Sequence, residues 1–204
     1  SITIQYWNPE EWLFSELDGG DGFDVLNLRY MGSPGYHEQD LSFAKNFEKV
    51  TLAIDGKEAT LKNSVFKAGT TGIVEAASPR MRLDASEETD SNLNIVGSDF
   101  SSEYGIGNDN IVGGSLDDNI QGKDGDDTIK GGPGNDTIDG GKGIDVAVYS
   151  GKREEYIIKT ISNEQIIEHT KINGDGTDIL LGINKLEFSD QTTEIKPQGI
   201  EYSG

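Results

Sequence analysis

The sequence predicts an all-β fold of the solenoid kind. Three observations lead to this expectation: a nine-residue repeat in residues 104–148, short β-rich runs on both sides of it, and a low apolar content. Hydrophobic residues make up 33% of the chain, and glycine occupies 27 of its 204 positions. A thick apolar core along the whole length is therefore not expected, and something besides apolar burial must help to hold the repeats together.

The charge of the chain limits its partners. There are 37 acidic and 17 basic residues, for a net charge of -20. This balance disfavours nucleic acid and favours cations as partners. No run reaches the roughly 18 apolar residues of a membrane helix, so no membrane span is expected. Cysteine is absent, which excludes disulfides and thiolate metal sites. The chain begins without Met or a recognisable secretory signal, and we expect it to belong to a larger parent polypeptide.

Residues 1–103 are predicted to be a β-solenoid-like lead-in with a cap. Their apolar-rich runs are typical of strands and lie at 23–30, 41–55, 59–66, 72–77, 81–86 and 93–98. The first 15 residues hold Tyr6, Trp7, Trp12 and Phe14. Aromatic side chains bury a large area, so this segment is expected to cover the open end of the solenoid.

Residues 104–148 divide without a gap into five nonapeptides: YGIGNDNIV, GGSLDDNIQ, GKDGDDTIK, GGPGNDTID and GGKGIDVAV. The eighth position is apolar in every unit, and the sixth is always aspartate: Asp109, Asp118, Asp127, Asp136 and Asp145. Glycines in the first half allow positive φ and tight turns that direct carbonyl oxygens toward a common point. The last three residues form a short strand whose middle side chain points inward. Hard oxygen ligands at this density suit Ca²⁺ better than Zn²⁺ or Cu²⁺.

This pattern resembles G-G-x-G-x-D-x-U-x, the nonapeptide of the RTX, or haemolysin-type calcium-binding, family. The resemblance implies a parallel β-roll in which two nonapeptides make one coil and Ca²⁺ lies between stacked loops. Units n and n+2 would then stack about 4.8 Å apart. We expect about three to five ions, including ions between Asp109 and Asp127, between Asp127 and Asp145, and between Asp118 and Asp136.

Glycine positions complete the expected metal sites. The glycines expected to contribute are Gly107, Gly113, Gly122, Gly125, Gly131, Gly134 and Gly140. An isolated nonapeptide, GGDGFDVLN at 19–27, adds Asp24 as a candidate ligand if another loop stacks on it. Tyr104, Leu116 and Lys123 stand where the pattern has glycine. A Cβ disfavours positive φ, so strained loops or weaker sites are predicted there.

Residues 149–204 are predicted to be a β-rich capping segment. EYIIKTI and EQIIEHT read as a hairpin, and NGDGTD as a turn. The segment resembles the one that often follows RTX repeats, and a solenoid needs a cover for its last coil. The two histidines, His37 and His169, have no partner motif and are predicted at the surface.

The resemblance implies a function as well as a fold. It points to a calcium-binding domain of a larger type I secreted protein, extracellular, disordered at low Ca²⁺ and folding on export. The alternative is a Ca²⁺-dependent adhesion or polysaccharide-binding module of an RTX adhesin or exoenzyme, with polysaccharide or a cell surface as partner. No G-x-S-x-G or H-E-x-x-H motif occurs, and the repeat aspartates already serve as ligands, so no enzymatic activity is predicted.

Overall fold

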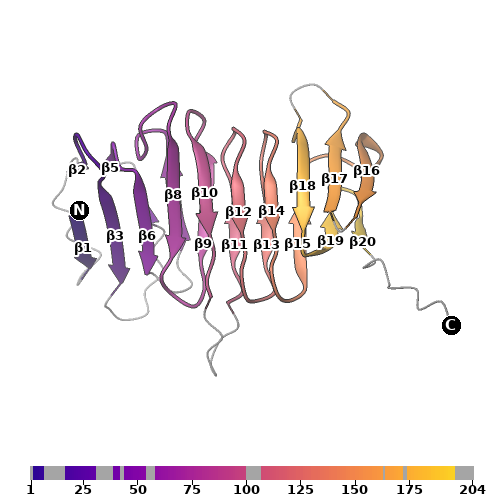
Figure 1. The fold of residues 1–204 in the computed structure, drawn as a ribbon, viewed down its shortest axis with the longest axis horizontal. Coiled ribbons are helices and arrows are strands. Elements are labelled where there is room, and N and C mark those ends of the chain that lie inside the picture. Colours follow the sequence, from indigo (N-terminus) through magenta and orange to yellow (C-terminus); the bar gives the residue numbers. More distant parts are fainter. Residues whose placement is uncertain are drawn as a thin grey trace.

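The structure is a computed structural model that describes residues 2–6, 17–30, 39–41, 44–53, 58–99, 107–162, 164–171 and 174–195. These residues form an elongated all-β solenoid whose strands follow one another along its long axis, from the N-terminal to the C-terminal end (Figure 1). The predicted fold class is confirmed. Within the described residues, no helix has the length and apolar character needed to cross a membrane.

Two large sheets build the solenoid. The first has ten strands in the order β1 (Ile2–Tyr6), β3 (Val25–Tyr30), β6 (Lys49–Ala53), β8 (Thr71–Ala76), β10 (Asn92–Val96), β12 (Asn119–Gln121), β14 (Thr137–Asp139), β18 (Thr177–Leu181), β17 (Glu164–His169) and β16 (Tyr156–Ile161). The second has eight, in the order β20 (Thr192–Glu194), β19 (Ile183–Glu187), β15 (Asp145–Val148), β13 (Thr128–Lys130), β11 (Asn110–Val112), β9 (Arg82–Glu87), β7 (Glu58–Lys62) and β4 (Gln39–Asp40). A separate pair joins β2 (Leu17–Asp18) to β5 (Ala44–Lys45).

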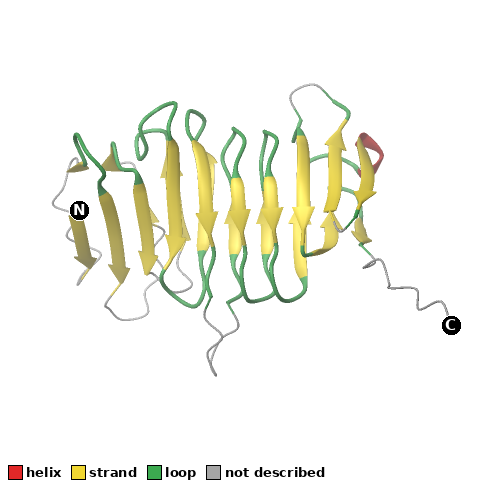
Figure 2. Cartoon of the chain, viewed as in Figure 1, coloured by secondary structure: helices red, strands yellow, loops and turns green. Residues whose placement is uncertain are grey.

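Successive coils stack in parallel, and the coil shortens where the nonapeptides begin. In the lead-in, Val50 pairs with Val74, 24 positions later. In the repeats, Ile120 pairs with Ile138, 18 positions later, so each nonapeptide lies over the one two units away. The predicted stacking order is therefore confirmed. Figure 2 shows the turns along the two long edges of the solenoid, between the strand layers.

Two files of buried apolar side chains fill the interior. One runs from the ten-stranded sheet, with one residue per strand: Leu26, Val50, Val74, Ile95, Ile120, Ile138 and Leu180. The other runs from the eight-stranded sheet: Ala59, Leu83, Ile111, Ile129, Ala147 and Leu186. The wider lead-in coils also bury Phe47, Phe66 and Met81. Each nonapeptide strand buries a single apolar residue, so the core is thinnest in the repeats.

The C-terminal flank extends the solenoid before closing it. β18 pairs in parallel with β14, and β19 pairs in parallel with β15, so together they add one further coil. The predicted hairpin forms as β16 and β17, which pair antiparallel with each other, and β17 also pairs antiparallel with β18. A short 3₁₀ turn, η1 (Arg153–Glu155), precedes β16. The antiparallel cap is confirmed, but it follows an added coil that was not predicted.

Several predicted features lie outside the described residues. They are the aromatic residues Trp7, Trp12 and Phe14 of the expected N-terminal cap, Tyr104 of the first nonapeptide, His37, and the tail after residue 195. Strands on either side of the predicted boundary at residues 148 and 149 pair within the same two sheets, β14 with β18 and β15 with β19. The division of the chain into three segments therefore stays a prediction.

Candidate metal centre

The repeat aspartates form two columns, one along each edge of the roll. The backbone N–H of Asp109 donates to Oδ1 of Asp127 at 2.7 Å, and the N–H of Asp127 donates to Oδ1 of Asp145 at 2.9 Å. In the other column, the N–H of Asp118 donates to Oδ1 of Asp136 at 2.9 Å. Each aspartate thus reaches back to the loop of the preceding coil. All five carboxylates are buried, none more than 3% exposed.

Both columns continue beyond the nonapeptides. The N–H of Asp136 donates to Oδ1 of Asp178 at 3.0 Å, and the N–H of Asp145 donates to Oδ1 of Asn184 at 2.6 Å. Asp178 belongs to the segment that the sequence analysis treated only as a cap. The sequence did hold a signal, because Gly176-Thr177-Asp178-Ile179-Leu180 has the G-x-D-x-U spacing of a repeat. In the structure, Gly176 takes the positive φ of a repeat loop, 83°.

The second carboxylate oxygen divides the aspartates into two groups. In Asp127, Asp136 and Asp145, Oδ2 is buried and has no hydrogen-bond partner. In Asp109, Oδ2 accepts the N–H of Ser98 at 2.7 Å. In Asp118, it accepts the N–H of Gly114 at 2.7 Å. Oδ2 is therefore open in three of the five predicted ligands, where a buried anionic oxygen lacks any compensating donor.

Each open oxygen faces the glycine that begins its own repeat. A Cβ on Gly122 would overlap both Oδ2 of Asp127 and the carbonyl oxygen of Gly140, one coil further on. A Cβ on Gly131 would likewise overlap Oδ2 of Asp136. The absence of a side chain at these positions therefore leaves space beside the carboxylate, and at Gly122 a backbone carbonyl borders that space.

The fourth-position glycines let the loops stack closely. Gly125 and Gly134 take φ of 132° and 139°, a region that favours glycine. A Cβ on Gly125 would come within 2.5 Å of the backbone of Gly107, and a Cβ on Gly134 within 2.6 Å of the carbonyl oxygen of Leu116. Successive loops are thus in backbone contact, and a side chain at either glycine would push them apart.

Burial makes these carboxylates poor acids. Burial, together with the charge of neighbouring carboxylates, raises the pKa of Asp127 to about 7 and that of Asp136 to about 8. Burial likewise raises the pKa of Asp118 to about 6 and that of Asp178 to about 7. A carboxyl group with a pKa of about 7 or 8 is protonated much of the time near neutral pH unless an opposite charge lies close by. The columns are therefore poised to exchange protons for cations.

The repeat segment has a known counterpart. Residues 112–147 match the model of the RTX calcium-binding nonapeptide repeat, in 4 copies. The chain carries RTX repeats. Among curated proteins, none matches the chain. RTX repeats bind Ca²⁺, are structural rather than catalytic, and typically occur in secreted bacterial proteins.

The open oxygens fit the cation that RTX repeats bind. Ca²⁺ takes carboxylate and carbonyl oxygens, and the roll offers both at Asp127 and Gly140. Among the described residues, no three acidic or histidine side chains gather into a site of their own. Backbone carbonyl oxygens such as that of Gly140 are available beside the open carboxylate oxygens. Asp127, Asp136 and Asp145 are the residues that would hold the ions through Oδ2, and their role as ligands stays a prediction.

Two RTX positions without glycine behave differently from each other. Lys123, at a second position, adopts a φ of 81°, so a non-glycine residue bears the strain that was predicted. Leu116, at a fourth position, does not take positive φ. The loop follows another path instead, and the N–H of Gly114 closes on Asp118. Of the two outcomes predicted for Leu116, strain is therefore absent, whereas a weaker site stays a prediction that agrees with the occupied Oδ2 of Asp118.

The isolated repeat at 19–27 has the backbone of an RTX loop. Gly20 and Gly22 take φ of 83° and 117°, at the second and fourth positions. The N–H of Asp24 donates to Oε2 of Glu48 at 2.6 Å, as the repeat aspartates donate to the next coil. A loop with an acidic residue therefore does stack on this repeat, and Asp24 remains a candidate ligand.

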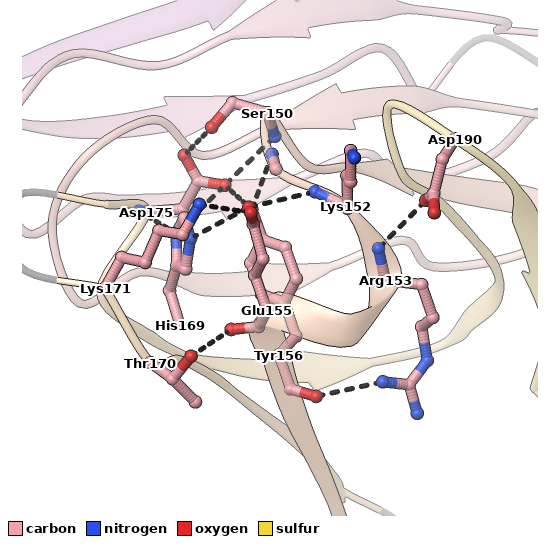
Figure 3. Close-up of polar contacts among 11 residues, drawn as sticks. Ser150, Lys152, Arg153, Glu155, Tyr156, His169, Thr170, Lys171, Asp175 and Asp190 are labelled. Carbon is pink, nitrogen blue, oxygen red and sulfur yellow. Dashed lines mark hydrogen bonds and ion pairs between the residues drawn. The ribbon is translucent and has the colours of Figure 1, made fainter.

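A polar cluster fastens the cap to the last coil, as Figure 3 shows. The carboxylate of Asp175 accepts hydrogen bonds from the N–H of Ser150 at 3.0 Å, from the Ser150 hydroxyl at 2.7 Å and from the Tyr156 hydroxyl. The N–H of Asp175 donates to Nδ1 of His169, whose ring stacks on Tyr156 at 4.2 Å. The His169 side chain is only 5% exposed, so its predicted surface position is wrong. The hairpin extends the ten-stranded sheet beyond β18, and its buried Tyr156 packs against Tyr149 and Phe188 at the end of the roll.

Proposed function

We propose that the chain is a calcium-dependent folding module of a larger polypeptide that leaves the cell through a type I secretion channel. The RTX repeats support a calcium-binding domain of a secreted protein. The finer proposal is that residues 107–148 stay disordered at the low Ca²⁺ of the cytosol and fold outside. The observation that supports it most is the set of three buried carboxylate oxygens without a donor.

The residues of the roll explain why folding should depend on the ion. Each nonapeptide strand buries about one apolar side chain, which gives little hydrophobic stabilisation against the entropy of ordering a glycine-rich loop. The same coil buries an aspartate whose charge has no donor at Oδ2. A bound Ca²⁺ supplies the compensating positive charge between stacked loops. Without it, the folded roll must hold either protons or uncompensated anions.

The magnitude suits a switch. Extracellular calcium modules bind with Kd of about 10⁻⁴ to 10⁻³ M. At ten times Kd, one site stabilises the fold by about 1.4 kcal/mol. Three sites would supply about 4 kcal/mol, a large share of the 5 to 15 kcal/mol that stabilises a typical domain. We expect at least three ions, one for each open oxygen.

Hydrogen exchange followed by mass spectrometry tests the proposal. In metal-free buffer at about pH 8, amides of 107–148 should exchange as in an unfolded chain, and millimolar Ca²⁺ should protect them. The triple replacement of Asp127, Asp136 and Asp145 by Asn should abolish the gain, while Asp139→Asn, at an exposed position in the same roll, should keep it. Equal protection with and without Ca²⁺ would contradict the switch.

The adhesion alternative remains a prediction, which basic residues such as Lys152 and Arg153, if exposed, would favour. Arg153 donates to the carbonyl oxygen of Tyr156 at 2.9 Å and lies over the Phe188 ring at 5.6 Å. Arg153 therefore takes part in the packing of the cap. Of these two basic residues, Lys152 is the exposed one.

A further inference from the structure

A loop outside the RTX repeats lies directly on one of them. Residues 88–91 connect β9 to β10 and stack on the loop that leads to Asp118. The N–H of Ser115 donates to the carbonyl oxygen of Glu88 at 2.9 Å, and the N–H of Leu93 donates to Oδ1 of Asp118 at 2.8 Å. A Cβ on Gly114 would lie 2.8 Å from the Glu88 carbonyl oxygen and 3.5 Å from Oδ2 of Asp118. The 88–91 loop therefore belongs to the coil that precedes Asp118 and lies in the same column as its loop.

Glu88 is an unusual residue for such a corner. Its side chain is fully buried, with 0% exposure. Oε1 accepts the N–H of Asp90 at 3.2 Å and the N–H of Ser91 at 3.1 Å, whereas Oε2 is buried without a partner. This is the pattern of Asp127, in which one oxygen accepts a backbone N–H and the other stays open. A buried carboxylate oxygen in that state is costly unless something binds it.

The same loop holds a second open oxygen. Oδ1 of Asp90 is also buried and without a partner. Its carboxylate is close enough to Glu88 to raise the pKa of that residue, although burial is the larger cause. The hydroxyl of Ser91, itself fully buried, donates to the carbonyl oxygen of Lys67 at 3.3 Å and can still accept. Ser91 belongs to the same short loop as the two carboxylates, and none of these three side chains carries a nitrogen or sulfur donor.

We propose that Glu88 and Asp90 hold a divalent cation of the hard, oxygen-seeking class, Ca²⁺ above all, through Oε2 and Oδ1. The site lies outside the RTX match, which begins at residue 112, and none of its ligands occupies a nonapeptide position. It would place an ion one coil before the repeats, where the wide lead-in meets the narrow roll. The inference does not rest on calcium-dependent folding of the roll, because its residues belong to the lead-in.

Counting bound ions tests the site. Purified chain is dialysed to equilibrium at about pH 8 against about 1 mM CaCl₂, and calcium is counted by atomic emission. Glu88→Gln keeps the shape of the side chain and an oxygen for the two N–H donors, but removes the anionic ligand. We expect this variant to bind one ion fewer than the wild type. Glu87→Gln is the matched control, since Glu87 is 60% exposed and the substitution changes the charge equally; its ion count should not change.

Each result decides the matter. An unchanged count in a folded Glu88→Gln protein would overturn the site and leave a proton shared between Glu88 and Asp90 as the occupant. If Glu88→Gln fails to fold in Ca²⁺ by circular dichroism, Asp90→Asn is counted in its place, with the same expected loss of one ion. Asp127→Asn separates this site from the roll. If Asp127→Asn binds fewer ions than the wild type but the Glu88 or Asp90 variant does not, the Glu88 site is refuted and the calcium sites of the roll are not. If Asp127→Asn binds as many ions as the wild type, the proposed calcium site of the roll is refuted instead.

Discussion

In metal-free buffer, raising the pH from about 5 to about 8 should destabilise the roll. Burial raises the pKa of Asp127 to about 7 and that of Asp136 to about 8, from an ordinary value of 3.8. A carboxyl group with a higher pKa in the folded chain binds its proton more tightly there than in the unfolded chain. Its stabilising contribution is complete below the unfolded value and is lost as the pH rises through the folded value. The window therefore runs from about pH 4 to about pH 8.

The size of the effect follows from the pKa difference. For Asp127 the folded and unfolded values differ by about 3, and the part that falls between pH 5 and pH 8 costs about 2 to 3 kcal/mol. Asp136 should cost somewhat more and Asp118, with a pKa of about 6, somewhat less. Together they approach the whole stability of a typical domain, so the metal-free roll should be largely unfolded at about pH 8.

Urea unfolding, followed by far-ultraviolet circular dichroism in buffers stripped on a chelating resin, measures this dependence. Asp127→Asn removes the titrating group and should reduce the loss of stability between the two pH values by about 2 to 3 kcal/mol. Asp139→Asn is the control, because Asp139 is exposed in the same roll. Wild-type stability that is flat or rises with pH would refute the reasoning, as would equal effects of the two variants.

Three further outcomes are expected. Gly122→Ala should lower the free energy of unfolding in saturating Ca²⁺ by about 1 to 3 kcal/mol or more and weaken Ca²⁺ binding, because the Cβ would overlap Oδ2 of Asp127. Urea unfolding and calorimetric titration measure the two effects. A variant with unchanged stability and affinity would contradict the role of Gly122 in leaving space beside that oxygen. Asp127→Asn should weaken Ca²⁺ binding more than Asp109→Asn, because Oδ2 of Asp127 has no hydrogen-bond partner whereas Oδ2 of Asp109 accepts the N–H of Ser98. Equal losses of affinity in calorimetric titration would argue against this difference between the two carboxylates. Leu116→Gly should restore a fourth-position glycine and free Asp118, adding one bound ion by equilibrium dialysis, and an unchanged count would show that the loop path does not depend on that residue.

The stacking was predictable because the repeat has a rigid period. With two nonapeptides in each coil, Asp109, Asp127 and Asp145 must fall in one column whatever the intervening residues are. The lead-in strands were equally accessible, since alternating apolar residues at 25–30 and 49–53 have to face one interior. Asp178 was missed because its repeat is truncated, although its G-x-D-x-U spacing was visible.

The state of each carboxylate could not be predicted from its own repeat. Whether Oδ2 lacks a hydrogen-bond partner depends on an N–H donor elsewhere in the chain. For Asp109 the donor is Ser98, in the long connection before the roll. For Asp118 it is Gly114, whose loop has no positive φ at Gly114 or Leu116. Glu88 illustrates the same limit. Its sequence neighbourhood, SEETDS, has no repeat pattern, and only the three-dimensional stacking places it in the Asp118 column.

Anomalous diffraction from crystals grown in Ca²⁺ tests the central claim most directly. We predict peaks within about 2.3 to 2.6 Å of Oδ2 of Asp127, Asp136 and Asp145, with backbone carbonyl oxygens completing each sphere. An ordered roll in millimolar Ca²⁺ that showed no peak at those three oxygens would contradict the account.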